Sequence, residues 1–214
     1  MRTTLLAILL RAALALSAAV IALPAAAHHP MGGAAPATFW QGLLSGVGHP
    51  VIEADHLVFL LGAAIAVAWA RVPLRQALLA LPAYALAGAV GTALRVPGLE
   101  LAGAELAVAI TLLAVAAALW LRRVPGAPAL AAIAAAGGLV HGYAYGEAVI
   151  GAETTPLLAY LTGLALTQTA MLAAAWFAAR QVPAPLSAIS ERLSRAIGLL
   201  VGAFALWSGA ALFA

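Results

Sequence analysis

The sequence predicts an all-α protein, a polytopic membrane bundle of six transmembrane helices after a cleaved signal peptide. Of its 214 residues, 65% are hydrophobic and only 8% are charged, whereas about 25% of the residues of an ordinary soluble domain are charged. The apolar residues gather in runs of about 20, the length that spans a bilayer as a helix. No run alternates with the period of two that predicts a strand.

The first 27 residues have the pattern of a signal peptide. Arg2 and Arg11 precede a short apolar run, which ends in Pro24 and three alanines; this order is typical of a secretory signal and its cleavage site. An uncleaved anchor is the alternative, but the run after Arg11 is shorter than a full span. We expect cleavage after Ala27, so that His28 becomes the N-terminus.

Residues 28–50 are predicted to form a periplasmic N-terminus with a short interfacial or re-entrant helix. The range 38–70 is almost continuously apolar, but one straight helix of that length would extend about 50 Å, well beyond a hydrocarbon core of about 30 Å. The helix must therefore break. Proline removes a backbone donor, so we place the break at Gly46, Gly48 and Pro50.

Residues 51–214 form the predicted membrane domain. Its six apolar segments cover 51–70, 74–94, 99–121, 128–149, 156–179 and 194–213. Short breaks with proline, glycine and arginine separate them. The many alanines and glycines favour close contact between helices in lipid.

The positive charges predict the orientation of the bundle. All ten basic residues are arginines. With an extracytoplasmic N-terminus, the outer loops hold only Arg95, and the cytoplasmic loops hold Arg71, Arg75, Arg122, Arg123, Arg180, Arg192 and Arg195. This bias predicts a multi-pass protein of a bacterial-type cytoplasmic membrane with both mature termini extracytoplasmic. The same scatter favours the lipid bilayer as the surroundings and argues against a nucleic-acid partner, despite a net charge of +3.

The stretch HPVIEADH, residues 49–56, is unusually polar for this chain. On a helix that begins near Pro50, Glu53 and His56 share a face, and His49 lies one turn before Glu53. Asp55, the only aspartate of the chain, points elsewhere. Ionisable groups inside hydrocarbon are costly, so these side chains should face a protein interior, a cavity or an ion.

A second polar stretch runs from His141 to Glu147. His141 and Tyr145 lie one turn apart, and glycines surround them. Counting residues from the outer ends of the spans places both His56 and His141 about 8–12 Å below the outer surface. We therefore expect these two histidines to meet.

These residue types predict a site for a divalent transition metal. Imidazole and carboxylate ligands suit Ni²⁺, Co²⁺, Zn²⁺ and Cu²⁺, and the absence of cysteine excludes thiolate and iron–sulfur sites. Neutral imidazole is required for binding, so uptake should depend on pH. The candidate ligands are His49, Glu53, Asp55, His56, His141, Glu147 and, at the mature N-terminus, His28 and His29.

The motifs His28-His29-Pro30, His49-Pro50-x4-Asp55-His56 and His141-Gly-Tyr-Ala-Tyr-Gly-Glu147 resemble those of the HupE/UreJ family. The order of a signal followed by six spans resembles it too. The resemblance implies a permease for nickel or cobalt that accompanies hydrogenase or urease and meets their maturation proteins. It implies that His49, Asp55 and His56 form the first metal motif and that His141 leads the second.

The chain departs from the family pattern in two of its spans. Tyr145 stands where many members have another histidine, and residues 161–172 contain no histidine. These departures leave the transported ion open between Ni²⁺ and Co²⁺, with Zn²⁺ and Cu²⁺ compatible as well.

Two other functions fit the same residues. His56 and His141 could be the axial ligands of a b-type haem in an electron-transfer protein, although haem gives no reason for Asp55 beside His56. A non-transporting assembly factor would instead use the glycine-rich helix faces to bind a partner. The sequence has no nucleotide-binding glycine loop and no serine with a matched base, so we expect no enzyme.

Overall fold

The computed structural model describes residues 34–181 and 187–212. The predicted signal peptide, His28 and His29 lie outside this part of the chain. The described elements are α2 (Phe39–Ile52), α3 (Ala54–Trp69), α4 (Leu74–Arg95), α5 (Ala104–Leu121), α6 (Ala127–Tyr145), the 3-10 helix η2 (Gly146–Val149), α7 (Thr154–Arg180) and α8 (Ser187–Ala211). No strand occurs in these two ranges, which confirms the all-α prediction.

The helices correspond to the predicted apolar segments, as five candidate spans and one bent pair of helices. Five stretches are each long and apolar enough to cross a membrane: α4, α5, α6 with η2, α7 and most of α8. The helices α2 and α3 pass the same test as a pair and are bent by 71° at a short break, which is the geometry of a broken span or of a re-entrant loop. The protein is therefore a multi-pass membrane protein, as the apolar segments predict.

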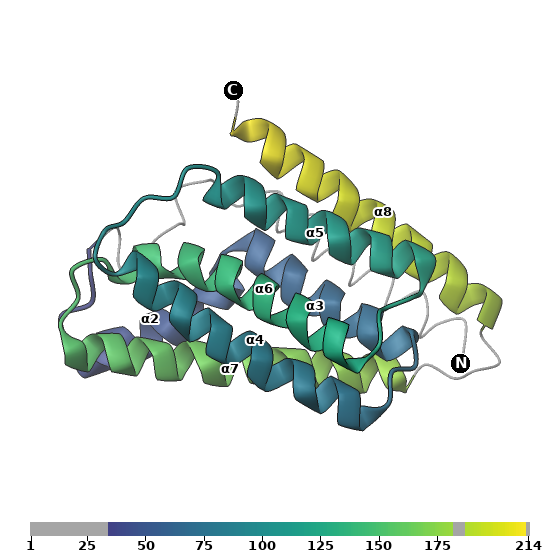
Figure 1. The fold of residues 1–214 in the computed structure, drawn as a ribbon, viewed down its shortest axis with the longest axis horizontal. Coiled ribbons are helices and arrows are strands. Elements are labelled where there is room, and N and C mark those ends of the chain that lie inside the picture. The colour runs from purple at the N-terminus through teal and green to yellow at the C-terminus, as the bar shows by residue number, and fades with distance from the viewer. Residues whose placement is uncertain (1–33, 182–186, 213–214) are drawn as a thin grey trace, which may run out of the picture.

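Three close helix pairs surround a central helix. α2 packs on α7, α4 on α6, and α5 on α8, while α3 contacts α7, α5 and α8. Figure 1 shows the helices running along the long axis, with α8 lying over α5. Trp69 at the end of α3 donates from its indole Nε1 to the carbonyl of Ala179 at the end of α7, at 3.2 Å. The two helices therefore end at the same level.

Charge distinguishes the two ends of the bundle. The turn between α6 and α7 and the start of α2 lie at the left in Figure 1, at what we call the site end. Six of the seven acidic residues lie in the half of the bundle that includes the site end. They are Glu53, Asp55, Glu100, Glu105, Glu147 and Glu153. The opposite end, the arginine end, carries the seven arginines predicted to be cytoplasmic.

Glycines bring two of the helix pairs into backbone contact. A side chain at Gly142 of α6 would meet the backbone oxygen of Gly88 in α4, and one at Gly46 of α2 would meet the backbone oxygen of Tyr160 in α7. The Thr92 hydroxyl lies 2.9 Å from the carbonyl oxygen of Gly142 and links α4 to α6. Lipid provides no hydrophobic force between helices, so close packing of this kind holds the bundle together.

Gly142→Ala is expected to destabilise the protein by about 1–3 kcal/mol, because the added methyl group overpacks the contact between α4 and α6. Thermal unfolding in detergent measures the change. Gly126→Ala is the matched control, since a Cβ atom at Gly126 meets nothing within 4 Å. Equal midpoints for the two variants would show that the two backbones are not in close contact at Gly142.

The break in the first span lies at Glu53, beyond the position predicted from the sequence. Pro50 lies inside α2, and Glu53 has extended backbone angles, φ −84° and ψ 118°. Placing the break at Gly46, Gly48 and Pro50 was therefore wrong. Gly46 serves the contact with α7 rather than a bend, and Pro50 falls in the last turn of α2, so that only the end of the helix is affected.

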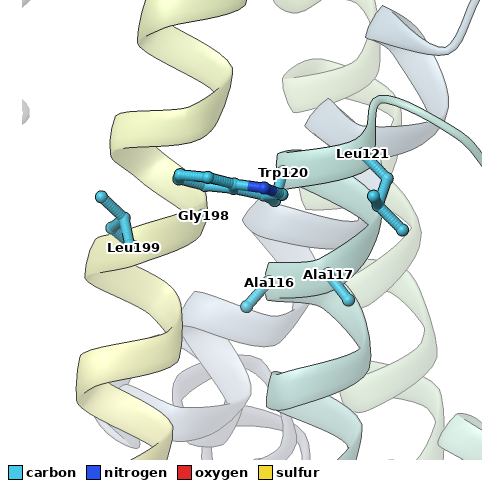
Figure 2. A pocket seen from close by; sticks show the side chains of 6 residues that line it. All are labelled: Ala116, Ala117, Trp120, Leu121, Gly198 and Leu199. Carbon is cyan, nitrogen blue, oxygen red and sulfur yellow. The ribbon is translucent and has the colours of Figure 1, made fainter.

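An apolar groove of about 340 Å³ lies between α5 and α8 near the arginine end. In Figure 2 the Trp120 ring reaches across from α5 toward Gly198 of α8. The Arg195 guanidinium lies over this ring, 5.6 Å from its centroid. The lining residues provide no metal ligand, and the groove lies away from the histidines.

Candidate metal site

The break between α2 and α3 brings together three potential metal ligands. The Nε2 atom of His49, in the last turn of α2, lies 2.8 Å from one carboxylate oxygen of Glu53. The Nε2 atom of His56, in the first turn of α3, lies 3.0 Å from the other. One ligand atom from each residue lies within 4.8 Å of the others, and no other such group occurs among the described residues. We call His49, Glu53 and His56 the trio.

α6 adds a third histidine beside the trio. The Nδ1 atoms of His56 and His141 lie 2.6 Å apart, so the two histidines meet as the residue count predicts. On its other side, His141 Nε2 lies 2.8 Å from the hydroxyl of Thr111 in α5, and the Phe59 ring stacks on the imidazole with centroids 4.0 Å apart. The imidazoles of His56 in α3 and His141 in α6 are thus connected to each other, to Glu53 on one side and to Thr111 of α5 on the other.

One assignment of the hydrogens that satisfies all of these contacts places a proton on Nδ1 of His56. The Thr111 hydroxyl has one hydrogen, which it donates to the carbonyl of Val108 at 2.7 Å. Its oxygen therefore accepts from Nε2–H of His141, and the Nδ1 of that ring becomes an acceptor. His56 must then donate from Nδ1, which leaves the Nε2 lone pair of a neutral His56 facing Glu53.

The same reasoning applies to His49. Tyr160 of α7 donates its hydroxyl hydrogen to the carbonyl of Tyr145 at 2.8 Å. The Tyr160 oxygen lies 2.7 Å from His49 Nδ1 and therefore accepts from it. The second Nε2 lone pair thus also faces Glu53 when His49 is neutral.

In this assignment the two Nε2 lone pairs face the two oxygens of one carboxylate, so the trio needs a positive charge to balance it. Protons on the rings can supply this charge, and so can a divalent cation. Two ligands of one metal ion are separated by at most about 4.2 Å, twice a bond length of about 2.1 Å. The trio therefore needs only small side-chain shifts to share an ion, and the outer Nδ1–H bonds are those that orient metal-binding histidines.

The ring of Tyr145 packs against both imidazoles of the trio. The ring of Tyr145 lies 4.0 Å from that of His56 and 4.9 Å from that of His49, between centroids. All three side chains are buried, whereas the Glu53 side chain is 16% exposed. Access to the trio is therefore from the side of the carboxylate.

Asp55 lies next to the trio but outside it. Its Oδ1 accepts from the backbone N–H of His56 at 2.8 Å, and the same oxygen lies 3.9 Å from His56 Nδ1. The side chain is 25% exposed. Asp55 thus adds negative charge at the start of α3, while the contact with both imidazoles belongs to Glu53.

Glu147 also lies at the site end, apart from the trio. Its carboxylate is 4.0 Å from the guanidinium of Arg95, and half of its side chain is exposed. Thr162 of α7 is exposed and donates to the carbonyl of Leu158 in its own helix. Neither side chain touches the histidines.

The direct contact between His56 and His141 disfavours a haem. Two axial ligands must lie on opposite faces of a porphyrin ring. With 2.6 Å between the Nδ1 atoms and 4.9 Å between the ring centroids, no porphyrin fits between them.

Sequence reasoning missed Thr111 and Tyr160, the two residues whose hydroxyls set the tautomers. A signal for Thr111 is present, because it is the only hydroxyl residue in the apolar helix α5. Tyr160 has no comparable signal, because the contact of its helix face with α2 is known only from the fold. Only the fold shows that these helices deliver both hydroxyls to histidines.

Comparison with known proteins gives one match. A family model described as HupE / UreJ protein matches residues 14–208, nearly the whole chain. The matched range contains every residue of the site and reaches into the last span. Comparisons with curated proteins and with solved structures gave no significant match.

Proposed function

Because the chain belongs to the HupE/UreJ family, we propose that it is a permease or metal-delivery protein for Ni²⁺ or Co²⁺ that binds its ion at the trio. The family comprises accessory membrane proteins of hydrogenase and urease systems and not catalytic enzymes. The metal would serve the maturation of such a metalloenzyme, through maturation proteins that receive it.

The observation that carries the proposal is the convergence of two imidazole Nε2 atoms on one carboxylate. Mixed nitrogen and oxygen ligands of this kind suit divalent Ni, Co, Zn and Cu. A site with three protein ligands leaves coordination positions open for water, and incomplete ligation allows the ion to leave again. The trio is therefore better suited to an ion that is transported than to one that stays bound.

The other candidate residues surround the trio in this proposal. Asp55 and Glu147 are partly exposed at the site end, where negative charge raises the local concentration of cations. His141 holds the ring of His56. His28 and His29, at the predicted mature N-terminus, offer two imidazoles outside the membrane.

The arginines support an orientation with the site end outside. The positive-inside rule assigns the arginine end to the cytoplasm. The ion would then enter from the extracytoplasmic side of a bacterial-type cytoplasmic membrane, past the exposed edge of Glu53, and leave toward the arginine end.

Two measurements test the proposal. Detergent-purified mature protein is titrated with Ni²⁺, Co²⁺, Zn²⁺ and Cu²⁺, and proteoliposomes are assayed for uptake of the metal that binds best. We expect one ion to bind per chain and to be taken up. The double variant His49→Ala/His56→Ala should lose both activities, whereas His28→Ala/His29→Ala, with the same number of imidazoles removed, should keep binding at the trio.

The outcomes separate permease from assembly factor. Binding without uptake, together with a metalloenzyme that stays immature in a deletion strain despite normal cellular metal, would favour the non-transporting factor. Equal binding by the wild type and the double variant His49→Ala/His56→Ala would place the ion elsewhere and contradict the proposal.

A further inference from the structure

The groove between α5 and α8 is apolar along its length and opens on the outer surface of the bundle. Its six lining residues carry no charge, namely Ala116, Ala117, Trp120 and Leu121 of α5 and Gly198 and Leu199 of α8. The two backbones approach closely at its base, because a Cβ atom at Gly198 would lie 2.9 Å from the backbone oxygen of Ala116. The Trp120 side chain is 45% exposed. In a membrane protein, such an open apolar groove faces lipid.

Tryptophan and arginine indicate the level of the groove in the membrane. The Arg195 guanidinium lies over the Trp120 ring, 5.6 Å from its centroid. The same pairing occurs on α7 at the arginine end, where the Arg180 guanidinium lies 5.1 Å from the centroid of the Trp176 ring. Tryptophan is enriched at the headgroup level of a bilayer. The groove therefore starts near the headgroups and extends one turn of α5 deeper, to Ala116.

Positive charge surrounds the headgroup end of the groove. Arg122 and Arg123 follow the last residue of α5, and Arg192 and Arg195 belong to the first half of α8. Glu191 pairs with Arg195 at 2.6 Å. Four arginines and this one glutamate leave a net charge of +3, that is, four minus one. A single acidic side chain therefore does not neutralise the arginines at this end of the groove.

We propose that the groove binds an acyl chain of an anionic phospholipid whose phosphate contacts Arg122 and Arg195. The chain would lie against the apolar lining, and guanidinium groups suit phosphate oxygens. Basic pockets between transmembrane helices on the cytoplasmic side bind anionic headgroups, and the positive-inside rule assigns the arginine end to that side. The groove lies away from the trio, so this inference does not depend on which ion the trio binds.

The backbone at Arg122 allows a clean removal of charge. Arg122 has a left-handed conformation, φ 51°, in which glycine is the usual residue at the end of a helix. Arg122→Gly therefore keeps the turn after α5. Arg71, just after α3, has the same conformation, φ 57°, and is exposed at the arginine end. It offers a matched control away from the groove.

Lipid affinity tests the charged end. Detergent-purified protein is titrated with phosphatidylglycerol and with phosphatidylcholine of the same acyl chains, and bound lipid is counted by native mass spectrometry. We expect one phosphatidylglycerol to bind at least about tenfold more tightly than phosphatidylcholine. Arg122→Gly/Arg195→Gln should lose this preference. Arg71→Gly/Arg75→Gln, which also removes two exposed arginines from this end, should keep it.

A bulky side chain tests the groove itself. Ala117→Phe places a ring in the groove from an exposed position of α5, and it should weaken phosphatidylglycerol binding by about tenfold or more, because the acyl chain loses buried CH₂ groups. Ala178→Phe, exposed on α7 near the same end, should leave binding unchanged. Glycerol phosphate, which has the anionic group without the chains, should not displace the lipid.

Three outcomes would overturn the inference. Equal affinity of the wild type for the two lipids would remove the headgroup preference and leave the arginines to a soluble acidic partner. Wild-type lipid binding by Ala117→Phe would place the acyl chain outside the groove. Displacement of the lipid by glycerol phosphate would assign the arginines to a free anion.

Discussion

Glu53→Gln is expected to weaken metal binding by about 100-fold or more, beyond the 10–100-fold that loss of an outer-shell partner costs. The substitution keeps the shape of the side chain and removes its negative charge. It leaves two buried imidazoles without the carboxylate that both of them face. Titration of the purified variant with the ion that the wild type binds best measures the loss.

Two controls show whether the effect belongs to Glu53. Glu147→Gln removes a carboxylate of the same chemistry at the site end, and binding should change by less than about threefold, because that side chain is half exposed and screened by water. Asp55→Asn keeps an oxygen that can accept from the His56 backbone, so an intermediate loss is expected. Full binding by Glu53→Gln and none by Asp55→Asn would assign the ligand to Asp55 instead.

Thr111→Val is expected to weaken binding by about 10–100-fold, although Thr111 is not a ligand. The change removes the acceptor of His141 Nε2–H, so that His141 no longer has to accept from His56. The Nε2 lone pair of His56 is then no longer held toward Glu53. Tyr160→Phe should act in the same way on His49, whose Nδ1–H loses its acceptor.

NMR spectra of the histidine rings distinguish a change of tautomer from a change in packing. The nitrogen resonances of ¹⁵N-labelled histidine report which ring nitrogen carries the proton, and in Thr111→Val the His56 and His141 signals should move. Thr111→Ser, which keeps the hydroxyl, should retain both the spectrum and the affinity. Wild-type affinity in Thr111→Val would show that the hydrogen bond through His141 does not orient His56.

The fold class follows from hydropathy because a bilayer demands apolar helices of a fixed length. The segments predicted at 74–94 and 99–121 correspond to α4 and α5 within a few residues. The position of the break between α2 and α3 could not be predicted from the sequence, because a glycine in a membrane helix can either weaken the helix or allow a neighbouring helix to approach. Gly46 was interpreted as weakening α2, whereas it lets the backbone of α7 approach, and only the partner helix reveals which role applies.

The candidate site was also predictable only in part. The meeting of His56 with His141 was predicted from a count that started the first span at residue 51. The helix pair begins at Phe39 instead, so the contact depends on the bend between α2 and α3 as well as on depth. Which carboxylate faces the imidazoles depends on the backbone angles of Glu53, and no periodicity encodes these. The hydroxyls of Thr111 and Tyr160 depend on which helices are neighbours, and the sequence does not specify this.

The bend at Glu53 also places two helix ends inside the protein. The end of a helix carries about half an elementary charge, negative at the carboxyl terminus and positive at the amino terminus. The amino end of α3 offsets part of the negative charge of Glu53 and Asp55, while the carboxyl end of α2 attracts a cation. A straight helix would have neither charge at this depth, so part of the electrostatic field at the trio comes from the path of the backbone and persists in every side-chain variant that keeps the bend.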